Sequence, residues 1–298
     1  GTMKETNTAA TGSPTNVKTS IFEKFSYGMG DVACNVVFAL TSGLVTYFYT
    51  NVIGISAGLV GMILLISRIF DGISDVAIGL IMDKVHSRHG RARAWVLWMA
   101  IPYAVSAVAL FCIPANASTA VQAIYIFITY NLCTTVVYTA LNLPYGAMAP
   151  LMTSNEQDIA KINLFRMSMS PIGNMIVTAA TLPIINRMGG DQAAWIKVTI
   201  IYAVISIAFL LWCFFGTKER VNTEAAREAE QLPIKVRFGA LLHNKYFIIL
   251  MLTSLCQALF QTINGTCGTY YAQYILGNNE LFGEHNMAGN IPQHIVCL

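Results

Sequence analysis

The fold of this chain is decided by residues 57–82, which read AGLVGMILLISRIFDGISDVAIGLIM. The run has 26 residues and only three charged side chains, whereas an α-helix needs about 20 apolar residues to cross the hydrocarbon core of a bilayer. A lone strand cannot satisfy its backbone groups in lipid. The run therefore predicts a transmembrane helix.

Similar apolar runs occur along the whole chain, at 26–50, 94–114, 119–149, 164–186, 194–215 and 246–276, and an eighth begins near Met287. Of the 298 residues, 55% are apolar and 11% are charged, against about a quarter charged in a soluble domain. The mean hydropathy is +0.56. This composition excludes a disordered chain, a secreted disulfide scaffold and an ordinary cytosolic enzyme, and it predicts an all-α integral membrane protein.

Basic residues indicate the orientation of these helices, because cytoplasmic loops carry an excess of Lys and Arg. Fifteen Lys and Arg residues fall on the N-terminal tail and every second connection, and only Arg187 and Lys197 fall on the opposite side. We therefore expect a cytoplasmic N-terminus. The net charge of +3 is too small to indicate a nucleic-acid partner.

The order of the runs predicts four parts: a polar tail at 1–20, a six-helix bundle at 21–216, a cytoplasmic loop at 217–245 with a short surface helix at 223–231, and a helix with part of a second at 246–298. Six helices, a loop and further helices are the plan of transporters built from two six-helix halves. We expect this chain to hold one half and the start of the next, and not to transport alone.

The second run carries the most informative charges. Asp71 and Asp75 lie one helical turn apart on one face, and Arg68 lies one turn before Asp71. Two carboxylates this close repel each other, and ionisable groups are costly in lipid. A dehydrated Na⁺ or a shared proton would relieve the repulsion. A structural ion pair between Arg68 and Asp71 is the alternative, although one arginine cannot balance two acids.

Polar side chains also recur at helical spacing on other runs, notably Asp31, Asn35, Asn142 and Arg166. They predict a water-filled cavity between helices, and ordinary interhelical hydrogen bonding is the alternative. The stretch GMGDVA at 28–33 matches a dinucleotide-binding fingerprint, but no strand precedes it, so we discount it. The seven cysteines are expected to pack as small apolar groups. No motif of an enzyme is present.

Several motifs together resemble the glycoside–pentoside–hexuronide:cation symporter family, a melibiose permease-like branch of the major facilitator superfamily. They are YGMGD at 27–31, YTNVIGISAG at 49–58, RIFDGISD at 68–75, GLIMDK at 79–84, GRAR at 90–93, NLPYGAM at 142–148 and FR at 165–166. The resemblance covers about residues 20–276. It implies an all-α fold whose N-terminal six-helix bundle is followed by the start of a C-terminal bundle.

The resemblance also implies roles for individual residues. The cation site it implies consists of Asp71, Asp75, Ser74 and Thr139. The substrate site it implies includes Tyr138 and Arg166, to which we add Asp31, Asn35 and Asn142. The cytoplasmic gate it implies consists of Asp83, Lys84, Arg91 and Arg93. The coupling ion would be Na⁺ or H⁺, with no other cofactor and no other metal.

The expected function is therefore cation-coupled symport of a sugar or glycoside across a bacterial cytoplasmic membrane. Cys34-Asn35 and Asn142 depart from the galactoside-carrying pattern, which has Lys-Asp and Asp at these places, so we do not predict a galactoside. A carrier of lipid-like solutes and a membrane interaction subunit that does not transport stay open as alternatives.

Overall fold

The computed structural model describes residues 18–85, 87–88, 90–221, 239, 243–257 and 259, without the side chains of residues 42, 43, 83 and 84. The chain divides into two compact units, Gly1–Asn222 and Thr223–Leu298. In the second unit an apolar helix, Lys245–Gln257, coincides with the first part of the expected span 246–276. The surface helix expected at 223–231, the remainder of that span and the eighth span near Met287 lie outside the described residues.

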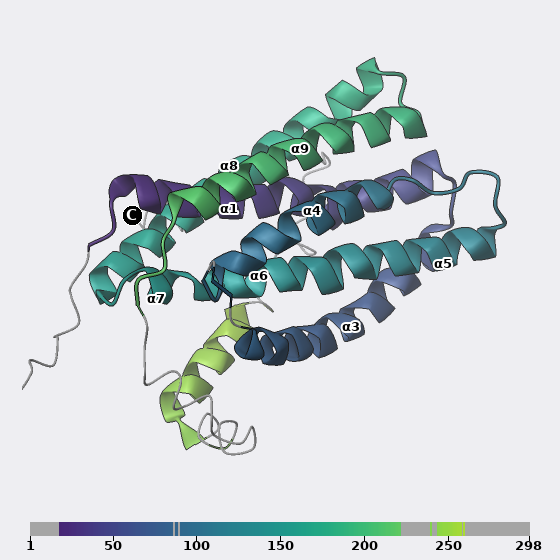
Figure 1. Cartoon of the computed structure of the whole chain (residues 1–298). Coiled ribbons are helices and arrows are strands. Elements are labelled where there is room, and N and C mark those ends of the chain that lie inside the picture. Colours follow the sequence, from purple (N-terminus) through teal and green to yellow (C-terminus); the bar gives the residue numbers. More distant parts are fainter. Residues whose placement is uncertain are drawn as a thin grey trace, which may run out of the picture. The chain divides into compact units, whose positions relative to one another are not determined.

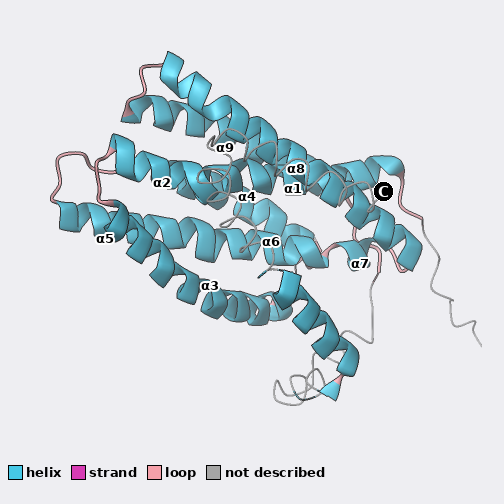
Figure 2. Ribbon diagram, turned by 180° about the vertical axis from the view of Figure 1, so that it is seen from behind, coloured by secondary structure: helices cyan, strands magenta, loops and turns pink. Residues whose placement is uncertain are grey.

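The first unit consists of helical rods that run roughly along a common direction (Figure 1). The first rod starts as α1 (Ile21–Ala39) and continues without a break through η1 (Leu40–Leu44), α2 (Val45–Tyr47) and η2 (Phe48–Val52), where η denotes a π-helical segment. The others are α3 (Ala57–Lys84), α4 (Arg93–Ala109), the rod of α5 (Thr119–Tyr130), η3 (Asn131–Val137) and α6 (Tyr138–Ala147), then α8 (Glu156–Arg187) and α9 (Gln192–Gly216). A short helix, α7 (Ala149–Met152), precedes α8. The regular elements of the described residues are all helical (Figure 2).

Four helices of the described part are long and apolar enough to cross a membrane: Ala57–Met82, Thr119–Ala147, Glu156–Arg187 and Gln192–Gly216. The expected spans 26–50 and 94–114 correspond to the first rod and to α4. With 17 residues, α4 rises about 26 Å, close to the thickness of the hydrocarbon core. Large apolar side chains such as Leu65, Ile69 and Ile73 are exposed on α3, as expected of a helix that faces lipid.

The ends of α8 and α4 differ from those of the expected spans. α8 begins at Glu156 rather than at 164, because Asn155 caps it by accepting from the backbone N–H groups of Gln157 and Asp158. Its first two turns are helical although they are too polar to be recognised as part of a span. α4 ends at Ala109 rather than at 114, and a turn at residues 110–111 follows it.

Close packing around α1 holds the unit together. A Cβ atom on Gly30 would lie 2.6 Å from Tyr145 Cε2 and 2.8 Å from Cys213 Sγ, so only glycine fits between α6 and α9. The rings of Tyr27 and Tyr145 stack with their centroids 4.6 Å apart. Each phenol donates to the other residue's backbone carbonyl, at 3.0 Å from Tyr27 to Tyr145. These contacts hold α1 and α6 side by side and thereby set the positions of their polar residues relative to each other.

Candidate functional site

A ladder of three side-chain hydrogen bonds joins α3 to the rod of α5, η3 and α6. Its rungs lie one helical turn apart, and the partners of each rung are 64 positions apart in the sequence. The Asn131 amide donates to Ser67 Oγ at 2.9 Å, the Thr135 hydroxyl to Asp71 Oδ1 at 2.5 Å, and the Thr139 hydroxyl to Asp75 Oδ1 at 3.0 Å. The carboxylates of Asp71 and Asp75 are therefore held by hydroxyl groups of one neighbouring rod.

A cavity of about 330 Å³ lies beside this ladder. Four of the expected site residues line it: Asp71, Asp75, Tyr138 and Thr139. The rest of the lining consists of Arg68 and of Phe38, Thr41, Tyr103, Tyr130, Cys133 and Thr134. The structure thus brings two carboxylates and several hydroxyl oxygens to one space. Such a set of hard oxygen donors suits a small cation.

The alternative of a purely structural ion pair is weakly supported by the geometry. Arg68 Nη1 lies 3.4 Å from Asp71 Oδ2, and the Arg68 side chain is 72% exposed, so the pair is a loose one that contributes little. Within the described residues no basic side chain forms an ion pair with Asp75. Among the described residues, the second negative charge therefore has no basic partner.

Ser74, the remaining expected cation ligand, has a different environment. Its hydroxyl donates to the backbone carbonyl of Thr135 at 2.8 Å, and it is not among the residues that line the cavity. In this structure Ser74 ties α3 to η3 and does not share the space of Asp71 and Asp75. Its role as a ligand stays a prediction.

A second polar cluster lies where α1 packs on α8. The Asn35 amide donates to the Asp31 carbonyl at 2.9 Å and to Ser170 Oγ at 2.7 Å. Arg166 lies one turn before Ser170, with its guanidinium carbon 6.0 Å from the Tyr145 ring centroid, and it interacts electrostatically with Asp31. Its Nε is buried without a hydrogen-bond partner. These contacts group Asp31, Asn35 and Arg166 between α1 and α8, and the water-filled cavity expected around them stays a prediction.

Tyr138 connects this cluster to the cavity, and Asn142 is less clearly placed. Tyr138 lines the cavity and stacks on Phe38 with centroids 5.8 Å apart, and Asp31 and Arg166 lie within electrostatic range of its side chain. Asn142 follows one turn later on α6, is half-buried, and is not among the lining residues. The two polar regions therefore adjoin at Tyr138.

Two of the expected gate residues, Arg91 and Arg93, lie at the start of α4, and the other two, Asp83 and Lys84, are the last residues of α3. The backbone N–H groups of Arg91, Ala92 and Arg93 donate to the Glu219 carboxylate at 2.8, 2.9 and 2.7 Å. Gly90 has a φ of +106° and approaches the same carboxylate, a conformation that favours glycine. The Glu219 carboxylate thus caps α4 from the segment after α9, where a negative charge is favoured by the helix dipole.

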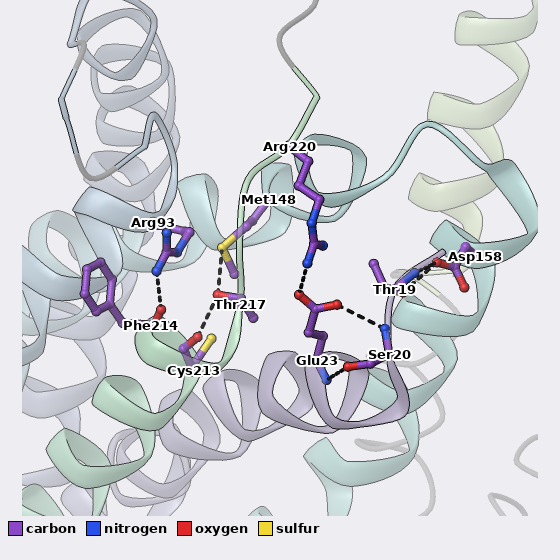
Figure 3. A network of polar contacts seen from close by, with 10 residues as sticks. All are labelled: Thr19, Ser20, Glu23, Arg93, Met148, Asp158, Cys213, Phe214, Thr217 and Arg220. Atoms are coloured by element: carbon purple, nitrogen blue, oxygen red, sulfur yellow. Dashed lines mark hydrogen bonds and ion pairs between the residues drawn. The ribbon is translucent and has the colours of Figure 1, made fainter. Parts of the chain in front are cut away.

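The Arg93 side chain is also anchored inside the first unit. Its Nη2 donates to the Phe214 carbonyl at 2.6 Å (Figure 3), and its guanidinium carbon lies 4.6 Å from the centre of the Phe214 ring. The side chains of Asp83 and Lys84 lie outside the described residues. For Arg93, the contacts that the structure describes join α4 to the end of α9.

The same end of the unit holds a network of charged side chains (Figure 3). Arg220 Nη2 pairs with Glu23 Oε1 at 2.5 Å, and Glu23 completes a capping box with Ser20 at the start of α1. Lys24 pairs with the buried Asp158 at 2.5 Å, which also accepts from Thr19. These contacts tie α1 to α8 and to the segment that follows α9.

Sequence reasoning missed three functional candidates: Thr135, Asn131 and Glu219. Thr135 and Asn131 carried a usable signal, because Asn131, Thr135 and Thr139 repeat with the same four-residue spacing as Ser67, Asp71 and Asp75. Glu219 carried none, since its partners are backbone groups more than 120 positions away. His86 and His89, in the same loop as the gate, lie outside the described residues.

Described cysteines are free thiols, with Cys34, Cys133 and Cys213 buried and Cys112 and Cys256 exposed. The three buried thiols pack in the apolar core, as the sequence indicated. Cys267 and Cys297 lie outside the described residues.

Comparison with known proteins points to one family. A family model described as MFS/sugar transport protein matches residues 26–297. The isoprimeverose transporter of Lactiplantibacillus pentosus is 34% identical over 256 residues, which cover 85% of this chain and 53% of that protein. The inner membrane symporter YicJ of Escherichia coli (strain K12) is 32% identical over 265 residues, 88% of this chain and 56% of that protein.

A third relative, the uncharacterized symporter YnaJ of Bacillus subtilis (strain 168), is 31% identical over 288 residues, 94% of this chain and 60% of that protein. The chain thus spans little more than half the length of these relatives. Their names describe transporters and symporters rather than enzymes.

Proposed function

Because the chain belongs to the MFS/sugar transport family of glycoside–pentoside–hexuronide:cation symporters, we propose that it forms the cation- and sugar-binding half of a secondary active transporter. The transporter couples inward movement of Na⁺ or H⁺ to symport of a glycoside, pentoside or hexuronide by alternating access. It acts in the bacterial cytoplasmic membrane with its N-terminus in the cytoplasm. It is not an enzyme, and it uses the coupling ion and no cofactor.

The ladder carries this proposal. Asp71 and Asp75 accept hydrogen bonds from Thr135 and Thr139 beside the cavity, and the loosely paired Arg68 supplies one positive charge against two negative ones. A charge surplus at membrane depth is costly unless a cation or a proton balances it. A coupling cation bound between the two carboxylates removes that cost.

The polar cluster on α1 and α8 supports a hydroxyl-rich substrate. Arg166 offers donors, Asp31 offers acceptors, and the Asn35 amide already bonds Ser170. The Nε of Arg166 is buried and unbonded, and such a group gains when a substrate oxygen accepts from it. Two residues of α6 add further polar groups between this cluster and the cation site. They are Tyr138, which lines the cavity, and Asn142, which follows one turn later.

Coupling follows from the adjacency of the two regions. Tyr138 lines the cation cavity and interacts with Asp31 and Arg166, so a cation and a sugar both stabilise the same arrangement of α1, α3 and α6. Each ligand then strengthens binding of the other by the same free energy, typically about 1–3 kcal/mol. The charged network at the cytoplasmic end keeps this half rigid while the two halves rock.

The test is glycoside binding to the chain in nanodiscs, with Na⁺ and with choline at fixed pH, followed by counterflow of the labelled glycoside in vesicles. The isoprimeverose transporter serves as a full-length positive control. We expect Na⁺ or a lower pH to strengthen glycoside binding. A chain that binds neither a glycoside nor a cation would contradict the proposal and favour an interaction subunit. Binding of lipid-like solutes alone would favour the other alternative.

A further inference from the structure

One rung of the ladder involves a residue with no assigned role. Thr135 lies in η3, the π-helical segment between α5 and α6, and its side chain is buried, with 3% of the residue exposed. π-helical turns inside α-helices frequently mark functional sites. Here the wide turn places the Thr135 hydroxyl 2.5 Å from Asp71 Oδ1.

We infer that Thr135 is a positioning residue of the cation site, which fixes the orientation of the Asp71 carboxylate and thereby sets the affinity for Na⁺. The inference rests on the proposed function, because it deepens the role of the same cavity. It places Thr135, with Asn131 behind it, in support of the cation ligands that the sequence indicated.

A chain of hydrogen bonds holds the Thr135 hydroxyl in place. Its oxygen lies 3.2 Å from Asn131 Oδ1, while the Asn131 amide donates to Ser67 Oγ at 2.9 Å and to the Phe127 carbonyl at 2.8 Å. Ser67 is itself buried and donates to the Ile63 carbonyl. The Thr135 hydroxyl has one proton, which it shares between Asp71 Oδ1 at 2.5 Å and, over a longer and weaker branch, Asn131 Oδ1 at 3.2 Å.

The Thr135 hydroxyl in turn orients the carboxylate of Asp71. Asp71 Oδ1 accepts from Thr135, whereas the exposed Arg68 pairs only loosely with Oδ2 at 3.4 Å, so the Thr135 hydroxyl is the closer contact and orients the carboxylate. Thr139 holds Asp75 in the same way, one turn along. Partners behind a ligating carboxylate orient it for the metal, and their removal typically weakens metal binding 10- to 100-fold.

The test is calorimetric titration of Na⁺ into the 298-residue chain in nanodiscs, with choline as the replacement ion. Thr135→Val keeps the shape and removes the hydroxyl, and we expect it to weaken Na⁺ binding about tenfold or more. Thr135→Ser restores the hydroxyl and should restore the affinity. Thr129→Val is the matched control, since Thr129 is buried in the same rod and donates to its own helix.

A second variant avoids dependence on a single substitution. Ser67→Ala removes the anchor of Asn131 at the far end of the bonded chain, and we expect a smaller loss of Na⁺ affinity in the same direction. Melting temperatures measured without Na⁺ separate a change in affinity from a change in folding. Wild-type Na⁺ affinity in Thr135→Val would overturn this inference alone. A wild-type chain that does not bind Na⁺ would overturn both this inference and the Na⁺ form of the proposed function.

Discussion

The Thr139 hydroxyl donates a 3.0 Å hydrogen bond to Asp75 Oδ1 across 64 positions of sequence. Asp75 is exposed to the cavity, and no described basic side chain forms an ion pair with it. The threonine therefore orients the carboxylate without neutralising it. At membrane depth, a carboxylate held in this way is costly unless a cation or a proton balances its charge.

We expect Asp75→Cys, and likewise Asp71→Cys, to abolish stimulation of sugar binding by the coupling cation. Sugar binding without the cation should persist, since neither carboxylate belongs to the Arg166 cluster. Binding of a labelled glycoside at fixed pH with and without Na⁺ measures both quantities. Glu156→Cys removes an exposed acid of α8 as a control. A full cation response in both aspartate variants would make the pair structural.

Arg166→Ala should weaken glycoside binding at least tenfold, because hydrogen bonds to a charged group contribute about 1.5–3 kcal/mol. Na⁺ binding measured by calorimetry should survive, since Arg166 lies outside the residues that line the cation cavity. Arg187→Ala, at the exposed far end of the same helix, is the control. Equal loss of sugar and cation binding would contradict a direct contact with sugar.

The proposed cytoplasmic location of the N-terminus predicts that a cysteine at position 117 reacts with a membrane-impermeant maleimide added outside the cell. Cys112 is exposed near this position, so Cys112→Ser forms the background for Ala117→Cys. Ser154→Cys, on the exposed turn before α8, should react only when the cytoplasmic side is accessible. Labelling of position 117 from the cytoplasm alone would reverse the orientation.

Glu219→Gln should lower the stability of the unit by about 1–2 kcal/mol, because three backbone N–H groups of residues 91–93 lose a charged acceptor. Thermal unfolding in detergent measures the change. Lys218→Gln alters the exposed neighbouring side chain and should leave the melting temperature unchanged. Identical melting temperatures for both variants would show that the cap on α4 contributes nothing.

Gly30→Ala should destabilise the unit by about 1–3 kcal/mol, since the new methyl group would overpack the contact between α1, α6 and α9. Gly72→Ala is the matched comparison, because nothing lies within 4 Å of its ideal Cβ. We expect a lower melting temperature for the first variant and no decrease for the second. Equal stability of the two variants would mean that α1 can move away from Tyr145 without loss.

The sequence by itself determined that the chain is an all-α membrane protein and that Asp71 and Asp75 share one face. Both conclusions depend on properties local to one helix: the length of an apolar run and the four-residue repeat of side chains. The family resemblance likewise depended on motifs read in order along the chain, and the family model and the relatives confirmed it.

Only the tertiary structure decided which groups meet those carboxylates. Thr135 reaches Asp71 because α3 and η3 pack in one particular register, and a shift of one residue would face the aspartates with different side chains. Ser74 was expected beside the cation, but the same register turns its hydroxyl to the Thr135 carbonyl. Glu219 reaches the start of α4 only because α9 ends there. Register between helices depends on the packing of the whole unit, which no local pattern records.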